Sequence, residues 1–236
     1  MAIPLFEFEV LQDGSLPLMA GGRRRPAVEH ACASVLIWPS GSKPDKENSL
    51  IVDPCFTARG FVQAQERLAR LGVTFDDIGA CFITHPHFDH FVSLPDSVAP
   101  SWRMFSTPAS GALAGIALES CPGHHPLLRA ARCPTQRGEL WAAGDAVIDR
   151  DYLVHWAYYW PNGYTPAQVV ITWLTVAVIV SRADVILPGH GAPIDVNTEL
   201  VEEMLDAWPE APHAELCAEV GQSLRARRKQ LRRKKK

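Results

Sequence analysis

Three histidines and one aspartate within six positions constrain this chain more than any other feature: His85, His87, Asp89 and His90. They follow the apolar stretch Ile78–Thr84, which predicts a buried strand. Because alternate residues of an extended chain project to the same side, His85 and His87 can bind one metal ion. Asp89 and His90 come where the chain must turn, so they can face a second ion.

Two divalent ions need more ligands than these four side chains provide, and three later turns offer them. Each turn follows an apolar run and contains a glycine beside a histidine or an aspartate. The three ligands are His124, Asp145 and His190. Loops at strand ends carry sites on a rigid scaffold. Each turn alone is common loop chemistry, but the four segments in this order indicate a two-metal site.

Apolar runs and turn signals along the chain predict a layered α/β protein. Strands are expected at residues 5–11, 34–38, 50–52, 78–84, 104–106, 116–121, 139–143 and 185–187. Helices are expected at residues 57–71, 165–182, from 197 onward and at 212–230. Thr165, followed by proline, is typical of a helix start.

The motifs resemble those of the metallo-β-lactamase superfamily, over roughly residues 34–193. The ordered elements are the strand-end Asp53 and the motifs HxHxDH, PGH, GDA and PGHG. The resemblance implies a four-layer αβ/βα sandwich, in which two mixed β-sheets pack face to face with helices outside and the site at their open edge. It implies a first metal ion bound by His85, His87 and His124, a second bound by Asp89, His90 and His190, and Asp145 as the bridge.

The resemblance also implies a hydrolase with two divalent ions, for which zinc is our first choice and iron and manganese are the alternatives. Two cations roughly 3.5–4 Å apart lower the pKa of a shared water, so a bridging hydroxide can attack a carbonyl at neutral pH. Asp89 and Asp145 are the expected catalytic carboxylates, and Asp89 orients the water and accepts a proton. Asp53 is expected to fix a metal-binding imidazole from behind.

The composition, with 47% hydrophobic and 21% charged residues, is typical of a globular domain. No apolar stretch reaches the roughly 20 residues of a membrane span. The N-terminal sequence has no signal-peptide pattern, and the six cysteines form no CxxC pair. We therefore expect free thiols and a cytoplasmic location. One domain is expected over residues 1–220, followed by a basic C-terminal tail over 221–236, with a homodimer as the default assembly.

The last twelve residues contain nine Lys or Arg and no acid, and without those nine charges the net charge of −3 becomes −12. Three interpretations of this tail stay open: a solvated helix end, a contact with nucleic-acid phosphates, and attraction to an anionic membrane surface. We favour the first, with a weak polyanion contact as the alternative. The acidic body argues against broad phosphate binding.

All four tyrosines lie in an aromatic segment, residues 149–164. This segment fits equally a satellite core and the wall of a pocket for an apolar substrate. The candidate substrate-binding residues are His155, Trp156, Tyr158, Tyr159, Trp160 and Tyr164. Two isolated histidines, His30 and His213, have no companions in the sequence and are expected to be structural.

Members of the superfamily open lactones and β-lactams and hydrolyse thioesters or phosphodiesters on similar metal sets. We predict a small-molecule lactone or related ester, because only 46 residues follow His190 and no inserted nuclease arm is visible before it. A phosphodiesterase or ribonuclease is the first alternative, with the basic tail as its direct support. A β-lactam or thioester hydrolase comes next. A metal-binding module without turnover is the least favoured, because the ligand set is complete.

Overall fold

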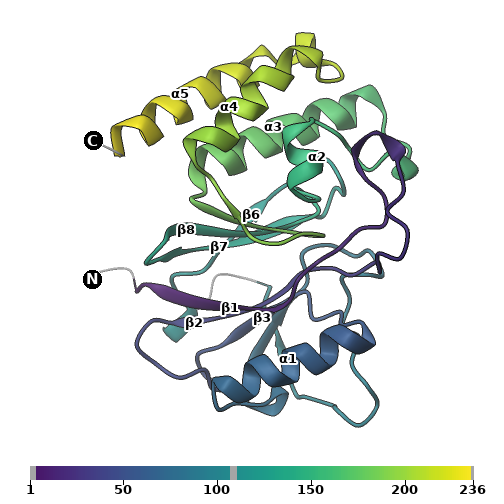
Figure 1. Cartoon of the computed structure of the whole chain (residues 1–236). Helices are drawn as coiled ribbons and strands as arrows, with labels where there is room; N and C mark the ends of the chain where they lie inside the picture. The colour runs from purple at the N-terminus through teal and green to yellow at the C-terminus, as the bar shows by residue number, and fades with distance from the viewer. Residues whose placement is uncertain (1–3, 107–110, 235–236) are drawn as a thin grey trace.

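The computed structural model describes residues 4–106 and 111–234, and two helix-covered sheets lie face to face in it (Figure 1). Helix α1 (Ala58–Arg70) covers one outer face, and three helices cover the other: α3 (Pro166–Arg182), α4 (Thr198–Ala207) and α5 (Ala218–Lys234). This succession of helix, sheet, sheet and helix is the predicted αβ/βα sandwich.

The first sheet contains β1 (Phe6–Gln12), β2 (Ser34–Pro39), β3 (Leu50–Val52), β4 (Ala80–Phe82) and β5 (Arg103–Met104). In it β1, β2 and β3 run antiparallel in succession, whereas β3, β4 and β5 are parallel. Leu50–Val52 and its parallel partner β4 are buried along their whole length, as short continuous apolar strands should be.

The second sheet contains β6 (Ala117–Ser120), β7 (Arg129–Thr135), β8 (Gly138–Gly144), β9 (Val185–Pro188) and β10 (Ile194–Asp195). Strands β6, β7 and β8 are antiparallel, β9 is parallel to β8, and β10 is antiparallel to β9. The parallel pair Phe6–Thr135 joins β1 to β7, so the two sheets are continuous at this edge.

The core follows the two-residue period of the strands. Val35 and Ile37 of β2 pack between the sheets with Leu140 of β8. Their neighbours Leu36 and Trp38 point to the other face and pack with α1. Buried apolar side chains on both faces of each sheet explain why the helices must cover the outside.

Capping residues fix the helix starts. The hydroxyl of Thr57 accepts a hydrogen bond from Gly60 N–H at the start of α1, and Thr165 forms a capping box with Gln168 at the start of α3. Asn197 caps α4 in the same way. No helix in the described ranges is long and apolar enough to span a membrane. The six cysteines are free.

The C-terminal helix starts later than residue 212. A left-handed backbone at His213, with φ 62°, and a short 3-10 turn (Ala214–Leu216) precede α5. Leu224 and Leu231 of α5 are buried in the cluster that contains α3 and α4. The expected division at residue 220 therefore falls inside α5, and the basic segment belongs to the packed domain up to Lys234. Residues 235 and 236 lie outside the described ranges.

Strands β7 and β10 and the short helix α2 (Arg150–Val154) are absent from the sequence-based expectation. Strand β7 contains Arg129, Arg132 and Pro134, which interrupt its apolar pattern. Arg132 nevertheless fits the strand, because its guanidinium pairs with Glu119 and Glu139 on the two neighbouring strands at 2.6 and 2.8 Å.

Candidate metal centre

The candidate ligands lie just beyond the ends of strands in both sheets. His85 to His90 follow β4, His124 follows β6, Asp145 follows β8 and His190 follows β9. The parallel pairing of β8 and β9 brings Gly144 opposite Pro188, so the turns that carry Asp145 and His190 lie together. The sheet register thus assembles residues that are 105 positions apart in sequence.

The first group of donors contains His85, His87, His124 and Asp145, whose ligand atoms lie within 4.8 Å of one another. His87 Nδ1 is 2.9 Å from His85 Nε2 and 3.0 Å from His124 Nε2. Asp145 Oδ2 lies 3.2 Å from His124 Nε2. Three nitrogens and one carboxylate oxygen therefore face one point.

The second group contains His90, Asp145 and His190, again within 4.8 Å. Asp145 Oδ1 is 3.2 Å from His90 Nε2 and 3.3 Å from His190 Nε2. Asp89 Oδ2 lies 3.5 Å from His190 Nε2. The two oxygens of Asp145 thus face different groups, and all seven predicted ligands lie in one region.

Buried hydrogen bonds orient the imidazoles of the HxHxDH motif. His90 Nδ1 is 2.8 Å from Asp53 Oδ2, which leaves His90 Nε2 directed toward Asp145. Asp53 also accepts hydrogen bonds from Thr84 N–H and from the Thr84 hydroxyl, both at 2.7 Å. The same hydroxyl lies 3.1 Å from His85 Nδ1. One buried aspartate and one threonine therefore set the ring orientation of two candidate ligands.

His124 and His190 are oriented by contacts that the sequence did not predict. The Tyr164 hydroxyl lies 2.7 Å from His124 Nδ1, and the Ala31 carbonyl oxygen accepts a hydrogen bond from His190 Nδ1 at 2.9 Å. Both Nδ1 atoms are thus engaged outside the site, which leaves the two Nε2 atoms directed toward Asp145.

The electrostatics of the two groups differ. Burial lowers the pKa of His85 to about 2 and that of His124 to about 4, so both imidazoles are neutral at pH 7. Burial is the largest influence on His90 and His190 and acts to lower the pKa of both. Asp145, together with Asp53 at His90 and the Ala31 carbonyl at His190, outweighs it and raises the pKa of both. Burial acts to raise the pKa of Asp89, yet the hydrogen bond with His30 and the charge of His90 lower it to about 2.

The donor set fits divalent cations. His90 Nε2 and Asp145 Oδ1 are fully buried and have no hydrogen-bond partner in the described part of the chain. Each unpaired buried polar atom costs about 1–3 kcal/mol, and more when it is charged. A cation between the imidazole nitrogens and the carboxylate oxygen would satisfy both atoms, and imidazole with carboxylate suits zinc, iron and manganese.

A glycine gives Asp145 its space. A Cβ atom built on Gly189 would overlap Asp145 Oδ1. The PGHG turn therefore needs glycine at this position so that the carboxylate can lie between the two groups.

A cavity of about 270 Å³ opens over the donors. Leu16, Ile148 and Tyr159 line it together with the metal-centre residues Asp89 and Asp145. Tyr159 and Asn162 are thus members of the aromatic segment that line this cavity, and Tyr164 contacts the site through His124.

Trp156, a candidate substrate-binding residue, does not line this cavity. Its ring is 1% exposed, packs edge-to-face on Trp173 and Trp208, and its indole N–H donates to Met204 O at 2.8 Å. Tyr158 packs on the same cluster. Trp160 is exposed. The aromatic segment is therefore both a satellite core and, at Tyr159, a cavity wall.

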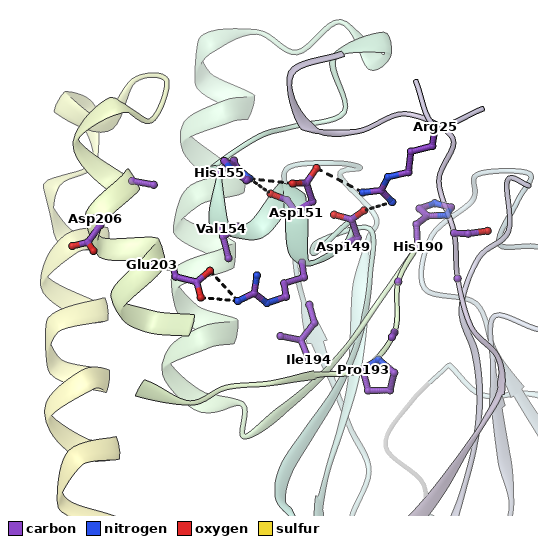
Figure 2. Close-up of a pocket in the computed structure, with 16 residues that line it drawn as sticks. Arg25, Asp149, Asp151, Val154, His155, His190, Pro193, Ile194, Glu203 and Asp206 are labelled. Atoms are coloured by element: carbon purple, nitrogen blue, oxygen red, sulfur yellow. Dashed lines mark hydrogen bonds and ion pairs between the residues drawn. The ribbon is translucent and has the colours of Figure 1, made fainter. Parts of the chain in front are cut away.

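His155 lines a different hollow, of about 860 Å³, which His190 also lines (Figure 2). There it contacts Asp151 (3.2 Å), which also pairs with Arg25 (3.8 Å). Figure 2 shows Arg25 reaching Asp149 as well. His155 thus takes part in this ion-pair cluster and does not line the 270 Å³ cavity.

His30, expected to be structural, belongs to the metal-centre region. Its Nε2 lies 2.9 Å from Asp89 Oδ2, and its ring meets that of His190 edge to face. Sequence spacing gave no signal for this contact, because His30 is separated from the HxHxDH motif by three strands and helix α1. His125, adjacent to a ligand, lies with its ring 5.3 Å from that of His87.

Comparisons with known proteins agree with this geometry. Residues 27–99 match the profile of the metallo-beta-lactamase superfamily. No curated protein sequence matches the chain. The solved structures give the fold: a probable metal-dependent hydrolase from Staphylococcus aureus is 14% identical, with a TM-score of 0.55 over 80% of this chain and 91% of that chain.

Two further structures have the same fold. A metallo-beta-lactamase family protein from Thermus thermophilus is 16% identical, with a TM-score of 0.50 over 85% of this chain and 81% of that chain. A quorum-quenching N-acyl homoserine lactone hydrolase is 14% identical, with a TM-score of 0.51 over 80% and 93%. The chain thus has the fold of these solved structures, and its donor set suits divalent cations. The match to the metallo-beta-lactamase superfamily covers residues 27–99, which contain the HxHxDH motif.

Proposed function

We propose that this protein is a binuclear metal-dependent hydrolase that opens lactones or related esters. The observation that carries the proposal is the position of Asp145. Its Oδ2 faces His124 Nε2 at 3.2 Å, while its Oδ1 faces His190 Nε2 at 3.3 Å. One carboxylate between two imidazole groups is the arrangement that a bridging ligand of two ions requires.

The residues of the chain divide the work. His85, His87, His124 and Asp145 would hold the first ion, and His90, His190, Asp145 and Asp89 would hold the second. When bound, the ions supply a Lewis acid for the carbonyl and a hydroxide nucleophile at neutral pH. Asp89 lines the cavity and is ionised at neutral pH, so it can orient the attacking water and accept its proton.

The cavity supports a small substrate with an apolar part. Its volume of about 270 Å³ is close to the lower end for ligand pockets, and Leu16, Ile148 and Tyr159 give it apolar walls. A lactone ring with an acyl chain fits this combination of a carbonyl and apolar surface. The fold shared with an N-acyl homoserine lactone hydrolase is consistent with this choice.

Zinc is the metal that we propose for both positions. Three imidazoles and one carboxylate form the four-donor set typical of zinc, while iron and manganese remain alternatives for the carboxylate-rich second group. Metal analysis of protein purified without added metal, and reloading with each ion, decides among them.

Phosphodiester hydrolysis is the second candidate, and the exposed basic residues of α5 are the observation that favours it. However, Lys234 pairs with Asp184 at the start of β9, whereas His190 follows the end of that strand. Six extended residues separate these points by roughly 20 Å. The basic end of α5 therefore lies away from the cavity, so we propose at most a weak polyanion contact there.

Hydrolysis assays on metal-quantified protein test the proposal. The panel contains a long-chain acyl lactone, a β-lactam, a glutathione thioester and a bis-aryl phosphodiester, each with and without chelator. Lactone turnover that chelation removes and metal restores is the expected result. Turnover of the phosphodiester alone would replace lactones with nucleic-acid-like substrates, and full activity after exhaustive chelation would contradict the metal mechanism.

We also propose a cytoplasmic location, because all six cysteines are free thiols and a reducing compartment keeps thiols reduced. A homodimer is the assembly to test by light scattering.

A further inference from the structure

His30 lies beside the second donor group, although it precedes the HxHxDH motif by 55 positions. Its Nε2 is 2.9 Å from Asp89 Oδ2, and His190 Nε2 is 3.5 Å from the same oxygen. The three atoms lie within 4.8 Å of one another. Two imidazole nitrogens therefore face one carboxylate oxygen.

The same arrangement occurs among the ligands of the first group. The rings of His85 and His87 meet edge to face, with an interplanar angle of 73° and centroids 4.5 Å apart. The rings of His30 and His190 meet at 67° and 4.9 Å. In both pairs the rings cross and do not stack, so nitrogens of both rings can reach a common point.

The backbone already holds His30 in this position. The carbonyl oxygen of its neighbour Ala31 accepts a hydrogen bond from His190 Nδ1 at 2.9 Å. Ala33 N–H donates to Gly189 O at 2.6 Å. The segment that carries His30 and the turn that carries His190 are thus hydrogen-bonded together, and little conformational entropy is lost when both side chains bind one ion.

The side chain of His30 lines the 270 Å³ cavity and is 35% exposed. A histidine that only paired with Asp89 on the surface would need no such position between the cavity and the His190 ring. The exposure also means that replacement of His30 leaves no hole in the core.

We infer that His30 is a further ligand of the second metal ion, binding through Nε2 beside Asp89 and His190. This inference rests on the proposed two-metal centre. It gives the second ion five protein donors, namely His30, Asp89, His90, Asp145 and His190, where the first ion has four. Five donors depart from the four-coordinate geometry typical of zinc, so the two ions should differ in affinity and in ligand-field spectrum.

Competition between the full chain and a chelator for Co²⁺ tests the inference by measuring the affinity of each ion. The variants are His30→Ala and His30→Gln, and His213→Gln is the matched control because His213 lies outside both donor groups. Wild type and the control should bind two ions. Both His30 variants should keep the affinity of the first ion and bind the second more than about 100-fold more weakly, which exceeds the 10–100-fold typical of an outer contact. The visible spectrum of the second Co²⁺ should change in both.

The His30→Gln variant distinguishes a metal-ligand role of His30 from a role in positioning Asp89. The glutamine side-chain amide can still donate a hydrogen bond to Asp89, but it is a poor metal ligand. Restored affinity in His30→Gln, or unchanged affinity in His30→Ala, would overturn the inference while the wild-type protein still bound two ions. A wild-type protein without a second ion would contradict the proposed function itself. Unchanged thermal unfolding of the metal-free variants checks that they fold.

Discussion

The parallel pair of strands β8 and β9 has one aspartate at each of its two ends: Asp184 just before β9 and Asp145 just after β8. The two carboxylates have different partners. At the start of β9, Asp184 Oδ1 accepts hydrogen bonds from Arg227 Nη2 at 2.9 Å and Lys234 Nζ at 3.1 Å. Its Oδ2 accepts from Glu139 N–H at 3.1 Å. At the end of β8, Asp145 faces imidazoles, and its Oδ1 has no hydrogen-bond partner in the described ranges.

This difference indicates that the charge of Asp184 is structural, because side chains of α5 compensate it. A buried charge without compensation costs several kcal/mol. At Asp184 the chain supplies its own cations from α5, which ties that helix to the sheet. At Asp145 the chain supplies imidazoles: those of His85 and His124 are neutral at pH 7, whereas the pKa of His90 and His190 is raised. A divalent cation at Asp145 would be the counterpart of Arg227 at Asp184. The same two strands therefore have a self-sufficient end and an end whose donors fit a metal ion.

The largest expected effect comes from replacing the aspartate at the metal end. Asp145→Asn removes the charge shared by both donor groups, so we expect loss of both ions and a fall in kcat/KM of at least about 10³-fold, or roughly 4 kcal/mol. Metal content by atomic emission and hydrolysis of the best substrate measure it. Asp184→Asn is the matched control at the other end and should keep both ions. If Asp145→Asn kept both ions, the proposed difference between the two aspartates would be wrong.

A smaller loss is expected from the carboxylate behind the second group. Asp53→Asn presents an amide N–H₂ or a weaker acceptor to His90 Nδ1, which disturbs the tautomer that leaves Nε2 free. Asn tolerates the left-handed backbone at this position, where φ is 46°. The second ion should bind about 10–100-fold more weakly, with the first unchanged.

The control for this variant is Asp76→Asn, an exposed aspartate outside the donor groups. Chelator competition measures both affinities. An equal loss for the two ions would mean that Asp53 supports the whole loop and not His90 in particular.

Tyr164→Phe should have a milder effect on the first group. It removes the hydroxyl that lies 2.7 Å from His124 Nδ1 while keeping the ring. We expect the first ion to bind at most about 10-fold more weakly, at the low end of outer-contact effects, and the second to be unaffected. Tyr158→Phe is the control, since its ring packs 5.0 Å from that of Tyr164. A loss confined to the second ion would contradict the assignment of His124 to the first group.

The donors could be predicted from sequence because the chemistry is local in each segment. Four of the candidate ligands form the HxHxDH motif after an apolar run, and three more stand beside a glycine after later runs. All seven lie in one region of the structure. The same runs predicted a layered α/β protein, whereas the two-sheet sandwich was implied by the resemblance of the motifs. Strand β7 could not be predicted, because Arg132 is compensated by two glutamates on other strands.

Contacts between distant loops were beyond sequence reasoning. His30 reaches Asp89 only through the pairing of its segment with the His190 turn, and no spacing encodes that pairing. Composition likewise cannot tell a core tryptophan such as Trp156 from a cavity residue such as Tyr159. The basic tail was misjudged in part, because Arg227 is buried and bonds to Asp184.

The smallest expected effect is the pH-dependent contribution of Asp184. Burial acts to raise its pKa, but the hydrogen bonds from Glu139 N–H, Arg227 and Lys234 lower it below the ordinary value. Because the folded pKa lies below the unfolded value of about 3.9, Asp184 stabilises the fold above that pH, and the stabilisation is lost as pH falls through the folded pKa. The carboxylate is 22% exposed, so we expect Asp184→Asn to lower the free energy of unfolding by only about 1 kcal/mol at pH 7. Urea denaturation of the metal-free proteins should show this difference shrinking below about pH 4. A difference that stayed constant down to pH 2 would mean that the self-sufficient end depends on packing and not on charge.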